Sequence, residues 1–212
     1  MTLEYFYAAH SAFAYIGSAR LFAIATRADC TVIHRPFDLD RVLTGSRVTS
    51  FGARTEAHLQ YYFGREIERW CEHRGVPMMA GFPTHHGHDY SLAGRLIIAA
   101  AEHGNGVDKL SHALLEAHWC DDGDLADEAT LARLAGSVGY DPVSLLASAR
   151  DPSMAAQYEA NTVEAIERSV FGSPTYFVDG DMFYGQDRLE LVERALTKPF
   201  AGRWPRAAPQ DV

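Results

Sequence analysis

The chain of 212 residues contains only three cysteines, Cys30, Cys71 and Cys120, and they lie far apart in the sequence. No two of them form a C-x-x-C pair, and their spacing matches neither a disulfide framework nor a metal-binding pattern. An odd number of widely spaced thiols suits a reducing compartment. Each cysteine is therefore expected to be a small side chain of the core or of a helix face rather than a reactive thiol.

The sequence also lacks long apolar runs and an excess of positive charge. Its longest apolar run, residues 96–101, is far too short to cross a bilayer, and the first residues lack the basic and apolar regions of a signal peptide. A net charge of -9 with scattered arginines argues against a nucleic-acid-binding surface. With 47% hydrophobic residues, the chain can bury a sizeable core. We expect a cytoplasmic globular protein that binds neither nucleic acid nor membrane.

Hydrophobic periodicity predicts the elements of the first three quarters of the chain. Residues 3–7 have the pattern of a strand, and residues 10–27 have that of a turn followed by a helix. Residues 31–35 alternate β-branched and polar side chains and are predicted to form a second strand. Residues 39–50 have the glycine and serine content of a loop. From there to about residue 169, every periodic segment is helical.

The end of the chain is predicted to return to strands. Residues 175–178 and 182–184 are strand candidates on either side of Asp179-Gly180, which is a strong hairpin signal. A closing helix is expected after Gly185, with Asp187 as its N-cap. The order is therefore β-α-β, a helical block, and then β-β-α.

This order is the outline of an α/β, thioredoxin-like fold with an all-helical domain inserted in its middle. We expect residues 1–45 and 161–198 to form the two parts of the thioredoxin-like domain. Residues 46–160 would form the inserted helical domain. The tail, residues 199–212, is rich in proline and alanine and is expected to be loosely held.

Redox proteins with this fold carry C-x-x-C at the start of the first helix. A helix N-terminus lowers the pKa of the first thiol, and the second thiol resolves the mixed disulfide. Here the matching stretch is Ser11-Ala12-Phe13-Ala14, so no disulfide can form. The site must use a sulfur from another molecule or perform no sulfur chemistry. In the simpler interpretation, Ser11 only caps the helix.

Five motifs are distributed over nearly the whole chain: Phe6-Tyr7; Ser11 with Tyr15; Arg69-Trp70 ahead of Gly75-Val76-Pro77; Trp119 with Asp124-Leu125-Ala126-Asp127; and Val170-Phe171-Gly172-Ser173-Pro174-Thr175 with Met182-Phe183-Tyr184-Gly185-Gln186-Asp187-Arg188-Leu189. Together they resemble the 2-hydroxychromene-2-carboxylate isomerase family. That family is related to kappa-class glutathione transferases and, more distantly, to DsbA-like thiol oxidases. The last motif is the most specific because it is long and carries fixed turn chemistry.

The resemblance implies glutathione as the cofactor and assigns roles to five residues, whereas the adjacent Arg188 is a candidate contact that could equally be a surface arginine. Ser11 would be the catalytic serine that faces the glutathione sulfur. Pro174 would be a cis-proline, and Ser173 would offer its backbone to the peptide part of glutathione. The γ-glutamyl end would be held by Gln186 and Asp187, with Arg188 as a further candidate contact.

Physical chemistry supports these roles independently of the resemblance. A glutathione thiol with a pKa of about 8.5 must shift by roughly 2 units to be a thiolate near neutral pH. A hydroxyl donor at Ser11, together with the N–H groups and dipole of a helix start, could supply that shift. A carboxylate at Asp187 beside open helix N–H groups suits a zwitterionic end.

The chain departs from the family pattern at three places. Ala12 replaces a proline that usually follows the serine, and His58-Leu59 replaces a common lysine. The stretch Gly45-Ser46-Arg47-Val48-Thr49 lacks the usual Asn and Pro-Pro. These positions line the substrate side in the family.

Three histidines, His85, His86 and His88, precede Asp89 in a loop that contains glycine and proline. They lack the H-x-x-x-H spacing of a helical metal site, and the sequence shows no matching distant ligand pair. We therefore expect no metal site in this protein.

The predicted function is that of a glutathione-dependent cis-trans isomerase of aromatic catabolism. The resemblance implies that 2-hydroxychromene-2-carboxylate, or a related conjugated aromatic compound, is converted to trans-o-hydroxybenzylidenepyruvate by reversible addition of the thiolate. One alternative is a kappa-like glutathione transferase, which would consume glutathione. A second is a glutathione-binding protein without catalytic activity. The expected partners are glutathione and a small aromatic substrate, and a homodimer is one assembly that we consider.

Overall fold

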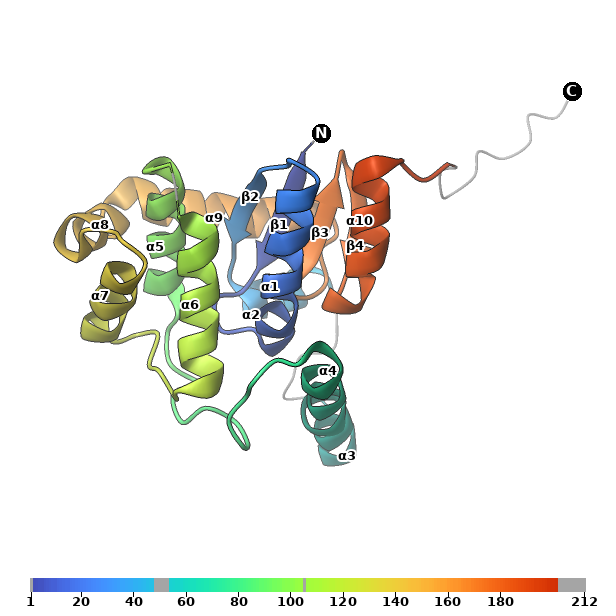
Figure 1. The fold of residues 1–212 in the computed structure, drawn as a ribbon. Helices are drawn as coiled ribbons and strands as arrows, with labels where there is room; N and C mark the ends of the chain where they lie inside the picture. Colours follow the sequence, from blue (N-terminus) through green and yellow to red (C-terminus); the bar gives the residue numbers. More distant parts are fainter. Residues whose placement is uncertain (1, 48–53, 105, 202–212) are drawn as a thin grey trace, which may run out of the picture.

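The computed structural model describes residues 2–47, 54–104 and 106–201. Its centre is a four-stranded mixed sheet with the strand order β2-β1-β3-β4 (Figure 1). The strands are β1 (Leu3–Tyr7), β2 (Val32–Pro36), β3 (Thr175–Val178) and β4 (Asp181–Tyr184). β1 is parallel to β2 and antiparallel to β3, and β3 and β4 form an antiparallel hairpin. The chain thus enters the middle of the sheet first and returns beside its own first strand at the end.

Both faces of the sheet are buried. Alternate side chains of β1 point to opposite sides, so this strand contributes to a core on each face. Tyr5 and Tyr7 belong to the larger core, which also holds buried residues of α1 (Ala12–Arg27) and α6 (Val107–Cys120). Phe6 belongs to a second core on the other face, beneath the helices α2 (Leu39–Gly45) and α9 (Pro152–Glu167). This layering of helices on both sides of the sheet confirms the predicted α/β, thioredoxin-like architecture (Figure 1).

The elements with strong local signals form where they were expected. β1 and α1 have the predicted bounds, and the β3–β4 hairpin turns through Asp179 and Gly180, which both have positive φ angles. Positive φ at both central residues is the requirement of a type I′ hairpin turn, which Asp-Gly meets at little cost. β2 is shifted by one residue from its prediction and includes Pro36.

Two predicted features near the ends of the sheet are wrong. Residues 39–45 form a short helix, α2 (Leu39–Gly45), rather than a loop, because Asp38 accepts the Arg41 N–H at 3.1 Å and three apolar residues of the helix are buried. Asp187 does not cap the last helix. It lies inside a 3₁₀ turn, η3 (Gln186–Arg188), and α10 (Leu189–Thr197) follows without a side-chain cap.

The middle of the chain is helical, as predicted. Its elements are α3 (Glu56–Leu59), the π-helical turn η2 (Gln60–Arg65), α4 (Glu66–Arg74), α5 (Ser91–Glu102), α6, α7 (Glu128–Ser137), α8 (Pro142–Ala149) and α9 (Pro152–Glu167). Asp127, Asp141 and Asp151 cap α7, α8 and α9 through their carboxylates. Within the described residues, no helix is both long enough and apolar enough to cross a membrane.

The predicted division of the chain into two domains stays a prediction. Its boundary between residues 160 and 161 falls inside α9, which is continuous from Pro152 to Glu167. Of the tail, only residues 199–201 are described. The proposal that this tail is loosely held therefore concerns residues that lie mostly outside the description.

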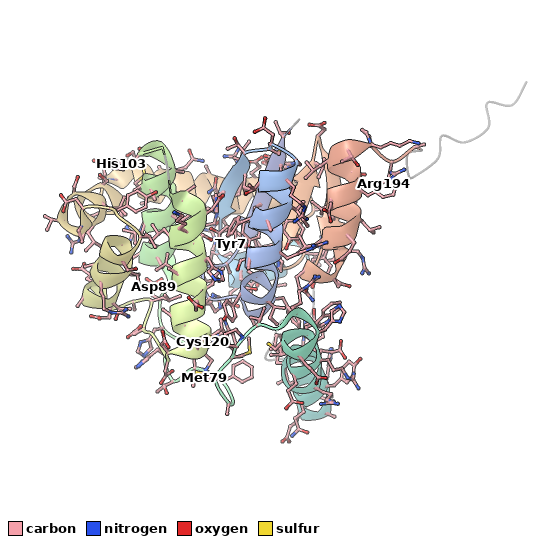
Figure 2. All side chains as sticks on the ribbon, viewed as in Figure 1. Tyr7, Met79, Asp89, His103, Cys120 and Arg194 are labelled. Carbon is pink, nitrogen blue, oxygen red and sulfur yellow. The ribbon has the colours of Figure 1, made fainter. Side chains whose placement is uncertain are left out.

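A series of hydrogen-bonded polar side chains joins α6 to the sheet. The Tyr7 hydroxyl lies 2.8 Å from both His34 Nδ1 and Ser111 Oγ, and His34 Nε2 lies 2.7 Å from the Asp108 carboxylate. His34 Nε2–H can therefore donate to Asp108 while its Nδ1 accepts the Tyr7 hydroxyl proton. Figure 2 labels Tyr7 where α1 and α6 meet. The helical insertion is thus fixed to β1 and β2 by satisfied polar groups as well as by apolar packing.

Gly17 lies where α1 packs against η3. A Cβ atom at this position would lie 2.7 Å from Gln186 Cβ and 3.2 Å from the Tyr176 hydroxyl. Gly17→Ala is therefore expected to lower the free energy of unfolding by about 1 kcal/mol, because overpacking of roughly 1 to 3 kcal/mol exceeds the helix-propensity gain of about 0.5 to 1 kcal/mol. Urea unfolding of both proteins measures this change in the free energy of unfolding. The control is Gly64→Ala, also in a helical segment but with nothing within 4 Å of its Cβ, and an equal effect in both variants would refute the packing argument.

Candidate functional site

The start of α1 faces the turn that precedes β3. The peptide bond between Ser173 and Pro174 in this turn is cis, as predicted. The Ala8 N–H donates to Ser173 Oγ at 3.0 Å, and the Ser11 hydroxyl donates to the Ser173 carbonyl at 3.3 Å. The Gly185 N–H donates to the Pro174 carbonyl at 2.9 Å. Three segments that are distant in sequence are therefore held together at one end of the sheet.

The side chain of Ser11 takes part in two hydrogen bonds. Its Oγ atom accepts the Ala14 N–H at 3.3 Å, which makes it the N-cap of α1, and its hydroxyl proton points to Ser173. Both distances are at the long end of the normal range, so neither bond is strong. The residue is 8% exposed and lines a cavity. The capping interpretation of Ser11 is thus correct, and the hydroxyl is still able to turn toward a ligand.

The larger of two adjoining cavities has a volume of about 630 Å³ and mostly aromatic and aliphatic walls. It is lined by His10, Ser11, Ala12, Phe13, Leu39, Asp40, Leu43, Arg54, Leu59, Tyr62, Phe63, Phe82, His86, Trp119, Phe171, Gly172, Ser173 and Tyr184. Arg54 is the single arginine among these lining residues, and its guanidinium lies 5.5 Å from the centre of the Tyr62 ring. Asp40 is the one carboxylate among them, and a flat, largely apolar ligand with a polar group beside Arg54 fits such a cavity.

The smaller cavity has a volume of about 170 Å³ and more polar walls. It shares Phe13, Tyr62, Ser173 and Tyr184 with the larger one, and it adds Glu66, Trp70, Gly185, Gln186, Asp187 and Arg188. The hydroxyl groups of Tyr62 and Tyr184 are 3.5 Å apart at this shared wall. The two cavities therefore meet beside Ser173, where a ligand in one could reach a ligand in the other.

The structure brings most of the predicted site residues to these walls. Ser11 lines the larger cavity, Ser173 lines both, and Gln186, Asp187 and Arg188 line the smaller one. Pro174 is buried and lines neither, so it can act only by shaping the turn. The functional roles of these six residues remain predictions.

Asp187 and Arg188 present opposite charges at the smaller cavity. Their side chains form an ion pair and are 36% and 50% exposed. Gly185 makes room for the Asp187 carboxylate, because a Cβ there would lie 2.4 Å from Asp187 Oδ1, and its φ of +96° favours glycine. An adjacent pair of opposite charges can exchange its internal contact for the two charges of a zwitterion.

Arg74 is a residue of this site that the sequence analysis missed. Its Nε donates to Gln186 Oε1 and its Nη2 donates to the Gln186 carbonyl, both at 3.0 Å, while Nη1 lies 3.2 Å from Glu190. These bonds fix the amide orientation of Gln186, whose NH₂ group is left as the donor for a ligand. No local signal could have found Arg74, because its partner is 112 residues away in the sequence.

His10 and His86 line another part of the larger cavity, and His118 lies behind them. His118 Nδ1 lies 2.9 Å from the Gly123 carbonyl and must donate to it, so His118 Nε2 accepts from His86 Nδ1 at 3.0 Å. The ring of His10 stacks on Tyr90 at 3.8 Å and lies 4.8 Å from that of His86. Burial lowers the pKa of all three imidazoles, and burial and the neighbouring His118 lower the pKa of His86 to about 4. These rings are therefore neutral near neutral pH.

The three cysteines agree with their predicted role. All are free and half-buried, and burial raises the pKa of each thiol, that of Cys71 to about 11. None of them lines either cavity.

The positions that depart from the family pattern are only partly described. Ala12 lines the larger cavity, and so does Leu59, whereas Val48 and Thr49 lie outside the described residues.

His85 and His88 lie next to Asp124 and not in the cavity walls.

Comparison with known proteins gives consistent results over nearly the whole chain. The family model of the DSBA-like thioredoxin domain matches residues 2–197. The 2-hydroxychromene-2-carboxylate isomerase of Sphingobium xenophagum is 27% identical over 198 residues, which cover 92% of this chain and 97% of that protein.

Two solved structures show the same fold. That of a 2-hydroxychromene-2-carboxylate isomerase superposes with a TM-score of 0.77 at 23% identity and covers 93% of this chain and 95% of its own. The cytosolic disulfide reductase DsbM from Pseudomonas aeruginosa, solved with GSH, has a TM-score of 0.61 at 18% identity and covers 94% of each chain.

Proposed function

Because the chain belongs to the DSBA-like thioredoxin domain family, we propose that it is a glutathione-dependent cis-trans isomerase of 2-hydroxychromene-2-carboxylate or of a related conjugated aromatic compound. The observation that carries this proposal is the Ser11 hydroxyl at the start of α1, beside the cis turn and next to the meeting point of two cavities. The family redox chemistry needs a cysteine at this helix start, and this chain has serine. The relative from Sphingobium xenophagum, which is named as an isomerase, supports the choice of reaction class.

The smaller cavity fits the γ-glutamyl end of glutathione. That end carries an ammonium and a carboxylate, which Asp187 and Arg188 complement in sign, and the Gln186 NH₂ group adds a neutral donor. The neighbouring structure of DsbM with GSH supports a glutathione site in this fold. Arg74 would act as a positioning residue by holding Gln186.

Ser173 and Ser11 would act together at the peptide and sulfur of glutathione. The Ser173 carbonyl now accepts the Ser11 hydroxyl proton. A peptide N–H of the ligand could take over this carbonyl, and Ser11 would then be released to donate to the thiolate. A hydroxyl donor and the positive end of the α1 dipole both favour the ionised thiol.

The larger cavity fits the substrate. Its aromatic walls suit a flat ring, and Arg54 would hold the carboxylate. When bound, glutathione would supply a thiolate that adds reversibly to the conjugated substrate, so that the former double bond can rotate before the thiolate leaves. The apolar side chains of Phe82, Phe171 and the buried Trp119 would reduce the access of water to the reacting atoms. A cytoplasmic location and a homodimer stay part of the proposal.

The direct test is the stoichiometry of glutathione during turnover of 2-hydroxychromene-2-carboxylate by the purified protein. An isomerase requires glutathione and consumes none, so free thiol stays constant while the trans product accumulates. Loss of one thiol per product would instead show a transferase. Glutathione binding without any product would show a binding protein, and either result would overturn the isomerase proposal.

Ser11→Ala is expected to lower turnover much more than it lowers glutathione affinity. Losing one donor to an anion costs about 2.7 to 4 kcal/mol, or roughly a hundredfold to a thousandfold in rate. The pKa of the bound thiol should rise, so the ultraviolet absorbance of the thiolate should appear at higher pH and the rate should partly recover in alkaline buffer. Ser18→Ala is the control, because Ser18 is a buried serine of the same helix that bonds Tyr15 and His112 and lines neither cavity. An unchanged thiol pKa in Ser11→Ala would leave Ser11 as a helix cap only.

Asp187→Asn is expected to weaken glutathione binding and to leave the fold intact. The lost charge-assisted contact to the ligand ammonium should cost about 1.5 to 3 kcal/mol, which is roughly a 10- to 150-fold rise in Kd. Calorimetric titration with glutathione measures the Kd of each protein. Asp181→Asn provides the control, because Asp181 is an exposed carboxylate at the other end of β4. Equal affinities for Asp187→Asn and the unaltered protein would remove Asp187 from the glutathione site.

A further inference from the structure

Two loops meet at the end of α6: the connection between α4 and α5, and the segment that follows α6. The connection between α4 and α5 passes the C-terminal end of α6 (Figure 1), and Figure 2 labels its Met79 beside Cys120. The Met79 N–H donates to the Trp119 carbonyl at 2.8 Å. Thr84 donates both its N–H and its hydroxyl to the Asp122 carboxylate, each at 2.6 Å. The relative placement of the two loops is therefore fixed by direct bonds.

Three metal-ligating groups converge between these loops. His88 Nδ1 lies 2.9 Å and His85 Nδ1 lies 3.7 Å from the same oxygen, Asp124 Oδ2. All three atoms lie within 4.8 Å of one another. Ligand atoms around a tetrahedral zinc ion, with bonds of about 2.0 to 2.1 Å, are about 3.3 Å apart. The observed separations bracket this value, so small side-chain rotations would complete the geometry.

The Asp124 carboxylate is oriented for this role by its other oxygen. Oδ1 accepts the Ala126 N–H at 2.9 Å, which leaves Oδ2 directed at the two histidines. Such a second bond fixes the direction of a ligand in metal sites. The side chains of His85, His88 and Asp124 are 35%, 52% and 22% exposed, so an ion could enter from solvent and keep a water ligand.

From this geometry we propose that His85, His88 and Asp124 form a binding site for a divalent transition metal of the zinc class. Two imidazoles and one carboxylate are the donors that zinc accepts, whereas magnesium and calcium prefer oxygen ligands. The sequence predicts no metal site because it shows no distant ligand pair that matches the histidine loop. Folding brings one distant ligand, Asp124, which lies 36 residues after His88, to this loop.

The site would stabilise a wall of the larger cavity. Phe82 and His86, which line this cavity, are in the same loop as the two histidine ligands. A bound ion would join this loop to the segment after α6 that carries Asp124. The site is not part of the proposed reaction, since its ligands lie outside the cavity walls.

The experiment uses the full chain after treatment with EDTA and dialysis. Zinc chloride is titrated by calorimetry, and cobalt chloride is titrated by visible absorption, which reports the coordination geometry. One ion per chain and a tetrahedral cobalt spectrum are expected, with a higher melting temperature in zinc and none of these effects with magnesium chloride.

Variants then test the ligands. His88→Ala and Asp124→Asn should each weaken zinc binding by about tenfold or more, and Asp124→Asn keeps an oxygen for the Ala126 N–H. His103→Ala is the control, because His103 is an exposed histidine at the end of α5. The proposal is overturned if zinc and cobalt do not bind, or if these variants bind zinc as tightly as the control does. No glutathione or substrate is needed, so this outcome is independent of the proposed function.

Discussion

Hydrogen bonds between the residues after β1 and the Ser173–Pro174 turn hold the candidate site together. Ala8 binds the Ser173 side chain and Ser11 binds the Ser173 carbonyl, while the Gly185 N–H binds Pro174 from the other side. This contact exists because β1 and β3 are antiparallel neighbours, so the end of one strand lies beside the start of the other. It places the N-terminus of α1 and the charged η3 turn around one point, and both cavities open there.

The chemistry available at that point follows from what the helix start can offer. A cysteine at Ser11 would bring its own sulfur, whereas a serine can only donate a proton to a sulfur that another molecule brings. The overall charge of -9 opposes an anionic ligand at long range. Arg188 in the smaller cavity and Arg54 in the larger one supply local positive charge, and the neutral rings of His10 and His86 add none. Any anionic ligand would therefore have to be held by short-range contacts.

Local sequence signals predicted the framework of this site but not its long-range contacts. The strand β1, the helix α1 and the Asp179-Gly180 turn depend on neighbouring residues, and so they could be found from the sequence. The helix α2 was missed because the glycine and serine content of residues 39–50 as a whole outweighed the single cap at Asp38. The 3₁₀ turn at Asp187 was mistaken for a helix start. Arg74 was missed because its contact with Gln186 is made by folding alone.

The two cavities differ in which parts of the chain line their walls. The smaller cavity depends on the η3 turn, which follows β4 of the sheet. The larger cavity takes Phe63, Phe82 and Trp119 from the helical segment between β2 and β3. The hydrogen bonds that link Tyr7, His34 and Asp108 hold this segment to the sheet. The smaller cavity also takes Tyr62, Glu66 and Trp70 from this helical segment, so the segment contributes walls to both cavities. Under the proposed function, substitutions in the helical segment would therefore alter the walls around both ligands, whereas the Ser173 turn and η3 are held by the sheet.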